Sequence, residues 1–289
     1  FRTLPDLRDE MPSHDTFTRV FERLDPDAFE RCFRSWTAAL AGTLCGVVSL
    51  DGKTLRRSFD RAGQKAAIHM VSAWAGEHGL VFGQVAADQK SNEITAIPRL
   101  LELLDIKGVI VTIDAMGCQK EIAGKIVDQG GDYLLAVKDN QPLLHEDIKQ
   151  VFAAGAKNGW KGRGHDVHTE WDKGHGRIER RTTTITWDAA WLFNTAGGAG
   201  WKGMRCLVEV ERERIIGEES TTSTHYFIAS VHTRKASVLA GACRAHWGVE
   251  NQLHWRLDVT FNEDQSRLRK GHSAQNMSRL RRIGLNLLR

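Results

Sequence analysis

The chain of 289 residues has little cysteine and no long apolar run. Its five cysteines form no Cys-x-x-Cys pair, which argues against a zinc site or a disulfide scaffold and fits a reducing cytoplasm. No stretch approaches about 18 consecutive apolar residues and no signal peptide is visible, so we expect a cytoplasmic protein without a membrane span. The hydrophobic content of 41% is ordinary for a globular protein with a real core.

Acidic residues are missing from the end of the chain. None follows Asp264, although the net charge of the whole chain is only +4. The basic residues of this stretch are Arg267, Arg269, Lys270, Arg279, Arg281, Arg282 and Arg289. Such a stretch favours a polyanionic partner such as nucleic acid, and the alternative is a solvated helix face.

The pattern along the chain predicts four segments. Residues 1–45 are expected to be helical, and residues 46–155 alternate strands with helices. Residues 156–232 read as a β-rich insertion, with strands predicted at Arg180–Trp187, Met204–Arg212 and Thr224–Val231. Residues 233–289 return to helix and carry the basic stretch. This order predicts an α/β fold with a mixed sheet flanked by helices.

Two aspartates follow short apolar runs. Val47–Leu50 and Val109–Ile113 are predicted strands, and Asp51 and Asp114 come directly after them. Carboxylates at strand ends project at the sheet edge where ligands bind in α/β proteins. Hard cations such as Mg²⁺ take oxygen ligands, and two nearby carboxylates repel unless a positive charge separates them. The pair therefore predicts a cation site.

A third acidic residue, Glu250, lies on a predicted helix spanning Ala236–Leu257. His246, Glu250 and His254 are spaced four residues apart, so they share a broad helix face. A polar stripe on such a helix needs a partner, and metal ions or phosphates would serve. One alternative is a mononuclear metalloenzyme that uses these three side chains as ligands.

Several longer motifs resemble one group of proteins and cover essentially the whole chain. They are Pro12–Phe17, Asp51–Arg56, Lys90–Pro98, Thr112–Gln119, Asp132–Gln141, His246–Trp255 and Leu257–Asp264. In this order they resemble the H-repeat-associated (ISAs-type) insertion-sequence transposases of the DDE superfamily.

The resemblance implies a ribonuclease H-like core in which Asp51, Asp114 and Glu250 are the catalytic, metal-binding acids. It implies Mg²⁺-dependent cleavage and strand transfer on double-stranded DNA, with Mn²⁺ as a substitute and two ions in the site. It further implies a homodimer acting on the two ends of an element. Relatives usually carry more sequence at both ends, so the alternative is a catalytically inactive, DNA-binding remnant.

The chain departs from related transposases around the third acid. Where relatives often have tyrosine, arginine and, later, lysine, this chain has Cys243, His246 and Leu257. We expect Arg244, His246 or Arg256 to supply the phosphate contact instead. Asp258 and Glu263 stay open as rival third ligands.

Further DNA-contacting residues are predicted beside the acids. Lys53, Arg56 and Arg57 follow Asp51, and Lys138, Asn140 and Gln141 follow a predicted strand at the same edge. For Trp247 and Trp255 the alternatives are stacking on a DNA base and packing in the core, and core packing is favoured.

Overall fold

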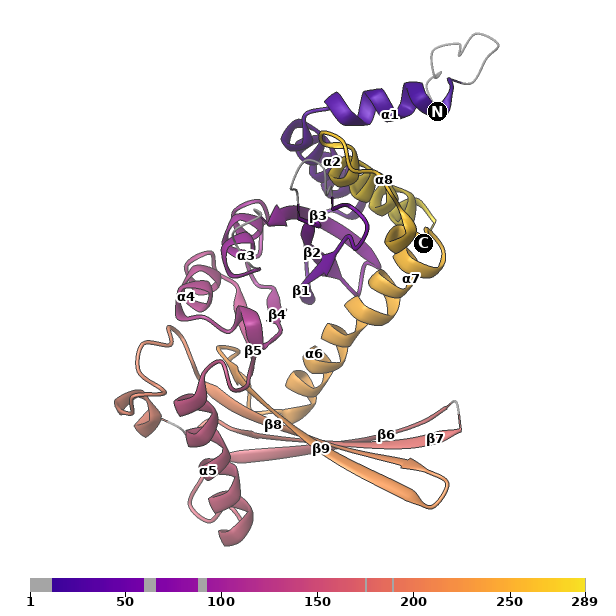
Figure 1. The fold of residues 1–289 in the computed structure, drawn as a ribbon. Helices are drawn as coiled ribbons and strands as arrows, with labels where there is room; N and C mark the ends of the chain where they lie inside the picture. The colour runs from indigo at the N-terminus through magenta and orange to yellow at the C-terminus, as the bar shows by residue number, and fades with distance from the viewer. Residues whose placement is uncertain (1–11, 60–65, 88–92, 175, 189, 289) are drawn as a thin grey trace.

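The structure is a computed structural model that describes residues 12–59, 66–87, 93–174, 176–188 and 190–288. Its strands form one mixed sheet in the order β3-β2-β1-β4-β5-β9-β8-β7-β6. They are β1 (Val47–Thr54), β2 (His69–Ala75), β3 (Leu80–Ala87), β4 (Ile110–Ile113), β5 (Asp132–Val137), β6 (His165–Gly174), β7 (Arg177–Thr186), β8 (Cys206–Ile216) and β9 (Glu219–Ala229). Figure 1 shows the core half of the sheet, β1–β5, and the long strands β6–β9 below it.

The core half has a ribonuclease H-like topology. Strands β3, β2 and β1 form an antiparallel meander, and β4 and β5 then add in parallel to β1. The apolar residues Val111 and Ile113 of β4 are buried, as expected for a parallel strand covered on both faces. The predicted fold class, a ribonuclease H-like mixed sheet flanked by helices, is confirmed.

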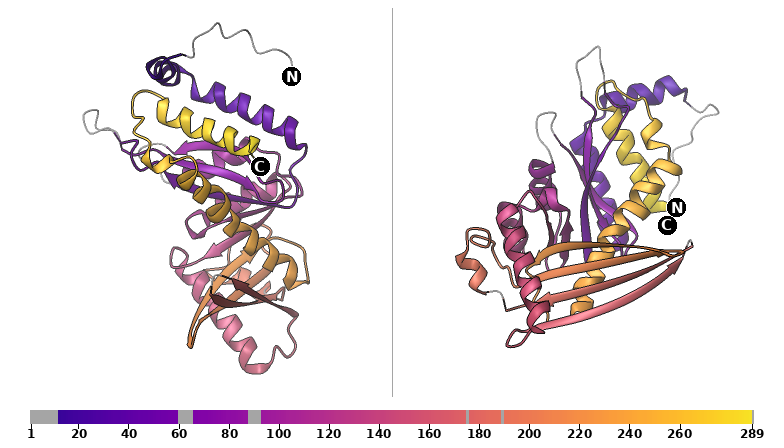
Figure 2. Two further views of the ribbon diagram at one scale, coloured as in Figure 1. Left: turned by 90° about the vertical axis from the view of Figure 1, so that its right-hand side faces the viewer. Right: turned by 60° about the horizontal axis from the view of Figure 1, so that its bottom comes forward.

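Helices cover both faces of the core half. Helices α3 and α4 lie on one face, while α6 and α7 cross the other (Figures 1 and 2). The α-helices are α1 (His14–Arg23), α2 (Pro26–Ala41), α3 (Glu93–Glu102), α4 (Lys120–Asp128), α5 (Pro142–Asn158), α6 (Ala236–Gly248), α7 (Trp255–Val259) and α8 (Ser273–Leu287). Across the described residues, no helix combines the length and apolar character that a membrane crossing requires.

Local sequence signals explain where several helices begin. The Asp25 carboxylate accepts a hydrogen bond from the Asp27 backbone N–H at 2.9 Å and so caps α2, whose first residue is Pro26. Proline at the first helical position loses no hydrogen bond there, and Pro142 opens α5 in the same way.

The β-rich segment continues the core sheet. Strand β9 pairs antiparallel with β5, from Leu134 opposite Ala229 to Val137 opposite Tyr226. Strands β7, β8 and β9 match the predicted strands in place, but β6 was not predicted. Its residues lack a buried apolar face, and what forms the strand is its full-length pairing with β7.

The basic stretch at the end of the chain is partly internal, which corrects its reading as an exposed polyanion-binding segment. Arg279 is buried and pairs with Glu30 of α2 at 2.5 Å. Arg282 is buried and pairs with Glu263 at 2.9 Å. Moving α8 would leave the buried charges of these ion pairs without partners, which is costly. The two arginines therefore hold α8 in place. Arg267 is exposed and stays available to a polyanion.

Candidate active site

Asp51 and Asp114 occupy matching positions on neighbouring parallel strands. Leu50 of β1 pairs in register with Ile113 of β4, and each aspartate is the next residue along its strand. Adjacent strands are about 4.8 Å apart, so the two acidic residues are neighbours at one edge of the sheet. The Asp114 carboxylate also accepts a hydrogen bond from the Met116 backbone N–H at 3.1 Å and caps the short 3₁₀ turn Ala115–Gly117.

Asp51 does not end its strand, which corrects the prediction that the strand stops at Leu50. Strand β1 runs on to Thr54, because Asp51–Thr54 keep pairing with β2 after the ladder with β4 has stopped. At Asp51, β1 therefore no longer pairs with β4 but still pairs with β2. The Asp51 side chain is partly exposed, and β1 is held at this point by its pairing with β2.

Glu250 lies on a helix that crosses the two strands. The predicted helix Ala236–Leu257 is present, but its middle is a π-helical segment, Val249–His254. There the Trp255 backbone N–H donates to the Glu250 carbonyl five residues earlier. Such segments insert an extra residue into a helix and often occur at functional sites. Glu250 is exposed.

The histidines on either side of Glu250 fasten this helix to the strands. His246 Nδ1 lies 3.0 Å from Thr112 Oγ1 on β4. His254 Nδ1 lies 3.4 Å from Asp51 Oδ2 on β1. The helix face that carries Glu250 is therefore anchored at both ends, beside Asp114 on one side and at Asp51 on the other.

The electrostatic environment of Asp51 favours a bound cation. Burial is the main cause that raises its pKa to about 7, and the charges of Glu93, Asp114 and Glu250 raise it further against the Gly52 backbone hydrogen bond. Burial likewise lowers the pKa of His254 to about 3, so that imidazole is neutral and does not offset the charge. A divalent cation would relieve the repulsion among these carboxylates.

The donor set fits a hard divalent ion held by a carboxylate pair. Mg²⁺ usually binds one or two protein carboxylates and keeps its other positions for water and substrate phosphate. In the part of the chain that the structure describes, no three His, Cys, Asp or Glu side chains stand close enough to hold one ion together. This holds for the set Asp51, Asp114 and Glu250 as well, so the structure brings Asp51 and Asp114 together as neighbours but does not close a three-ligand site. The mononuclear set His246, Glu250 and His254 is likewise not gathered around one point in the described residues.

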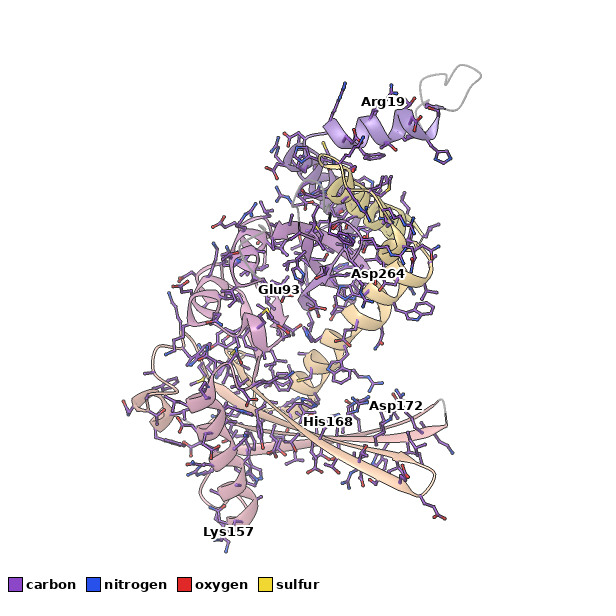
Figure 3. All side chains as sticks on the ribbon, in the orientation of Figure 1. Arg19, Glu93, Lys157, His168, Asp172 and Asp264 are labelled. Carbon is purple, nitrogen blue, oxygen red and sulfur yellow. The ribbon has the colours of Figure 1, made fainter. Side chains whose placement is uncertain are left out.

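The two rival third acids are committed elsewhere. The Glu263 carboxylate is fully buried against Arg282. Asp258 lies 2.7 Å from Lys53 Nζ, which also contacts Asp264 at 2.7 Å (Figure 3 labels Asp264). These carboxylates already pair with cations of the fold, whereas Glu250 is exposed.

Some of the predicted DNA contacts are exposed. Arg56 keeps 79% of its side chain exposed, with its Nε 3.1 Å from Asp264. Lys138 and Arg256 are also exposed, and Lys138 follows β5 at the same sheet edge as Asp114. Arg57 is partly buried, and its carbonyl accepts a hydrogen bond from Arg269.

Other predicted DNA contacts are engaged within the fold. Lys53 is 8% exposed and paired twice, and Arg244 Nη2 lies 2.9 Å from Asp172 of β6. The Asn140 amide donates to the Ala115 carbonyl, and Gln141 Nε2 donates to the Cys118 carbonyl at 3.0 Å. The two amides thus fasten the turn that follows Asp114, a role that the sequence does not reveal.

Trp247 and Trp255 are not core residues, which corrects the favoured reading. Trp247 is 39% exposed and Trp255 is 58% exposed. The Arg212 guanidinium lies 5.0 Å from the centre of the Trp247 ring. Large exposed rings beside a phosphate-binding site can stack on bases, since every base has a π-face.

Glu93 is an acidic neighbour of the site for which the motifs predicted no role. Glu93 opens α3 and lies 2.7 Å from His69 Nε2 on β2. Its charge contributes to the raised pKa of Asp51. The only signal in the sequence was its place within the motif Lys90–Pro98, whose first three residues lie outside the described ranges.

A ribonuclease H-like sheet with acidic residues on β1, after β4 and on a crossing helix defines a class of metal-dependent enzymes that act on nucleic acid. Comparison with known proteins narrows the class. The family described as "Transposase DDE domain" matches residues 45–287, and its associated N-terminal family matches residues 1–37.

Relatives agree with this assignment. The chain is 43% identical to YhhI of Escherichia coli (strain K12), named as an H repeat-associated transposase, over 98% of this chain and 75% of that protein. It is 42% identical to YncI of Escherichia coli O157:H7, named as a transposase, over 98% of this chain and 72% of that protein. Among solved structures, a match to the piggyBac transposase synaptic complex with hairpin DNA covers 84% of this chain and 52% of that one, with 10% identity and a TM-score of 0.37, and the assignment does not depend on it.

The chain therefore belongs to the transposase DDE domain family, as its motifs predicted. It is a DNA transposase, an enzyme whose chemistry depends on divalent metal ions.

Proposed function

We propose that Asp51, Asp114 and Glu250 carry the strand cleavage and strand transfer of an insertion sequence. The observation behind this is the in-register placement of Asp51 and Asp114 on adjacent parallel strands, with the helix of Glu250 anchored across them. Such an arrangement presents carboxylates to a scissile phosphate from two sides.

The proposed cofactor is Mg²⁺, replaceable by Mn²⁺, with two ions in the site. When bound, the ions activate the attacking water or 3′-hydroxyl and stabilise the leaving oxygen. Asp51 and Asp114 hold their side chains at a fixed strand spacing, and Glu250 closes the site from the helix. Neutral His254 contacts Asp51 without competing as a cation.

The proposed substrate is double-stranded DNA at the element ends and at the target. Arg56, Lys138 and Arg256 are exposed cations available to the phosphate backbone, and Trp247 and Trp255 present rings to bases. We extend the proposal to a homodimer on DNA, because an element has two ends that must be cut and joined together. Bacterial DNA as the substrate places the activity in the cytoplasm, at the nucleoid when the protein is bound.

Excision of a marked element tests the proposal. The Asp114→Asn protein should bind element-end DNA like the wild type and yet fail to excise the element, because the amide keeps the shape but loses the negative charge. The matched control is Asp139→Asn, whose fully exposed carboxylate follows the neighbouring strand β5. Normal excision by Asp114→Asn would remove that residue from the mechanism.

A further inference from the structure

Glu93 and His69 form a fixed pair on the flank of the active site. Glu93 Oε1 lies 2.7 Å from His69 Nε2, and His69 Nδ1 lies 2.9 Å from Thr54 Oγ1. The pair thus links the start of α3 to β2 and β1. The Glu93 side chain is only 12% exposed, so the carboxylate is held in place and not free in solvent (Glu93 is labelled in Figure 3).

The pair lies against the residue that follows Asp51. A methyl group built on Gly52 would stand 2.1 Å from Glu93 Oε1 and 2.2 Å from His69 Nε2, far inside contact distance. Successive side chains of a strand point to opposite faces, so Asp51 and the pair approach β1 from different sides. Only the bare Cα of Gly52 lets the Glu93 carboxylate come this close to the backbone beside Asp51.

We propose that Glu93 is a fourth carboxylate of the transposase site, which strengthens divalent-cation binding at Asp51, and that His69 positions it. The inference rests on the proposed function of Asp51. The Glu93 carboxylate lies against Gly52, the residue that follows Asp51, and is held there by His69. A negative charge fixed this close to Asp51 attracts a cation bound at Asp51 from across the strand.

Mn²⁺ binding to the full chain, measured by calorimetry without DNA, separates this role from a structural ion pair. Glu93→Gln should weaken Mn²⁺ binding about 10-fold, the effect typical of a carboxylate just outside the metal ligands. Glu102→Gln is the matched control, because it removes the same charge from the far end of α3, where Glu102 is exposed and pairs with Lys125. Thermal unfolding in chelator confirms that each variant is folded.

A second variant changes the position of Glu93 and leaves every charge in place. Gly52→Ala should displace the ends of the Glu93 and His69 side chains, while the strand itself tolerates alanine. It should weaken Mn²⁺ binding in the same direction as Glu93→Gln. If both variants bind Mn²⁺ as Glu102→Gln does, the inference is overturned.

The variant Asp51→Asn shows whether a negative result concerns Glu93 alone or the whole proposed cation site. Loss of Mn²⁺ binding in Asp51→Asn, with normal binding in Glu93→Gln and Gly52→Ala, rejects the role of Glu93 alone. Normal binding in Asp51→Asn rejects the cation site and the role of Glu93 with it. Loss in Asp51→Asn together with weakening in both of the other variants supports the inference.

Discussion

Asp51 and Asp114 stand one residue beyond Leu50 and Ile113, which pair in register on adjacent parallel strands. This relationship brings together two acids that are 63 positions apart in the chain. Because the backbone sets the spacing, the two carboxylates remain neighbours whether or not a cation lies between them. The ionised carboxylates of Asp51 and Asp114 therefore repel each other, and a cation bound beside them would offset this repulsion.

The pH dependence of stability should reveal the cost of ionising Asp51, which comes first from its burial and then from repulsion by the neighbouring carboxylates. The folded pKa of Asp51, about 7, lies above the ordinary value of 3.8, so ionised Asp51 destabilises the fold. In chelator, the wild type should lose stability as the pH rises from about 4 to about 7. Asp51→Asn removes this loss and should exceed the wild type by roughly 1–4 kcal/mol above pH 7.

Urea unfolding at several pH values measures this difference. Asp139→Asn, at a fully exposed carboxylate, should show no such growth with pH. The free energy of unfolding of Asp51→Asn should exceed that of the wild type by more as the pH rises. If this difference stays constant from acid to neutral pH, ionised Asp51 does not destabilise the fold.

The amide side chains behind Asp114 should matter for turnover more than for folding. Asn140→Ala and Gln141→Ala each remove a hydrogen bond to the turn after Asp114, costing about 1 kcal/mol of stability. Misplacement of Asp114 should slow DNA cleavage roughly 10–100-fold. Gln150→Ala, which removes an exposed amide contact to Glu146 on α5, is the control for kinetic assays at saturating DNA. Unchanged cleavage rates in both Asn140→Ala and Gln141→Ala would refute the positioning role of these two amides.

The buried arginines of α8 should behave as structural residues. Arg282→Met leaves Glu263 buried without its partner and should destabilise the fold by about 3–5 kcal/mol. Arg267→Met, in the same basic stretch but exposed, should change stability by less than about 0.5 kcal/mol. Chemical denaturation compares the two variants, and equal stability would contradict the burial of Arg282.

The exposed tryptophans should contribute to DNA binding and little to the core. Trp255→Ala should leave stability almost unchanged, whereas Trp74→Ala in the core should cost about 3–5 kcal/mol. If Trp255 stacks on a base, its loss should weaken binding to element-end DNA by about 1–3 kcal/mol. Fluorescence anisotropy measures the affinity, and wild-type affinity in Trp255→Ala would exclude stacking there.

The sequence predicted those parts of the fold that local pattern determines. The apolar runs before Asp51 and Asp114 identified β1 and β4. Strand β6 escaped because its stability comes from pairing with β7 and not from an apolar face of its own. Burial of Arg279 could not be foreseen either, since its partner Glu30 lies far away in the chain.

In the candidate site, too, the sequence predicted some features, and others became visible only from contacts in the folded chain. Motifs in the sequence singled out the three acids, but motifs do not reveal which neighbouring side chains are already engaged. Lys53 looked like a phosphate ligand until Asp258 and Asp264 were found beside it. Glu93 looked like an ordinary helix residue until folding placed it against Gly52.

Cleavage of DNA that carries the element ends, with purified protein and Mg²⁺, tests the central claim most directly. Asp51→Asn, Asp114→Asn and Glu250→Gln should each lower strand cleavage by about 10³-fold, equivalent to ~4 kcal/mol of transition-state stabilisation. All three should still bind the ends, and Asp139→Asn should cleave like the wild type. Cleavage at the wild-type rate by any one of the three variants would contradict the assignment of that residue to the active site.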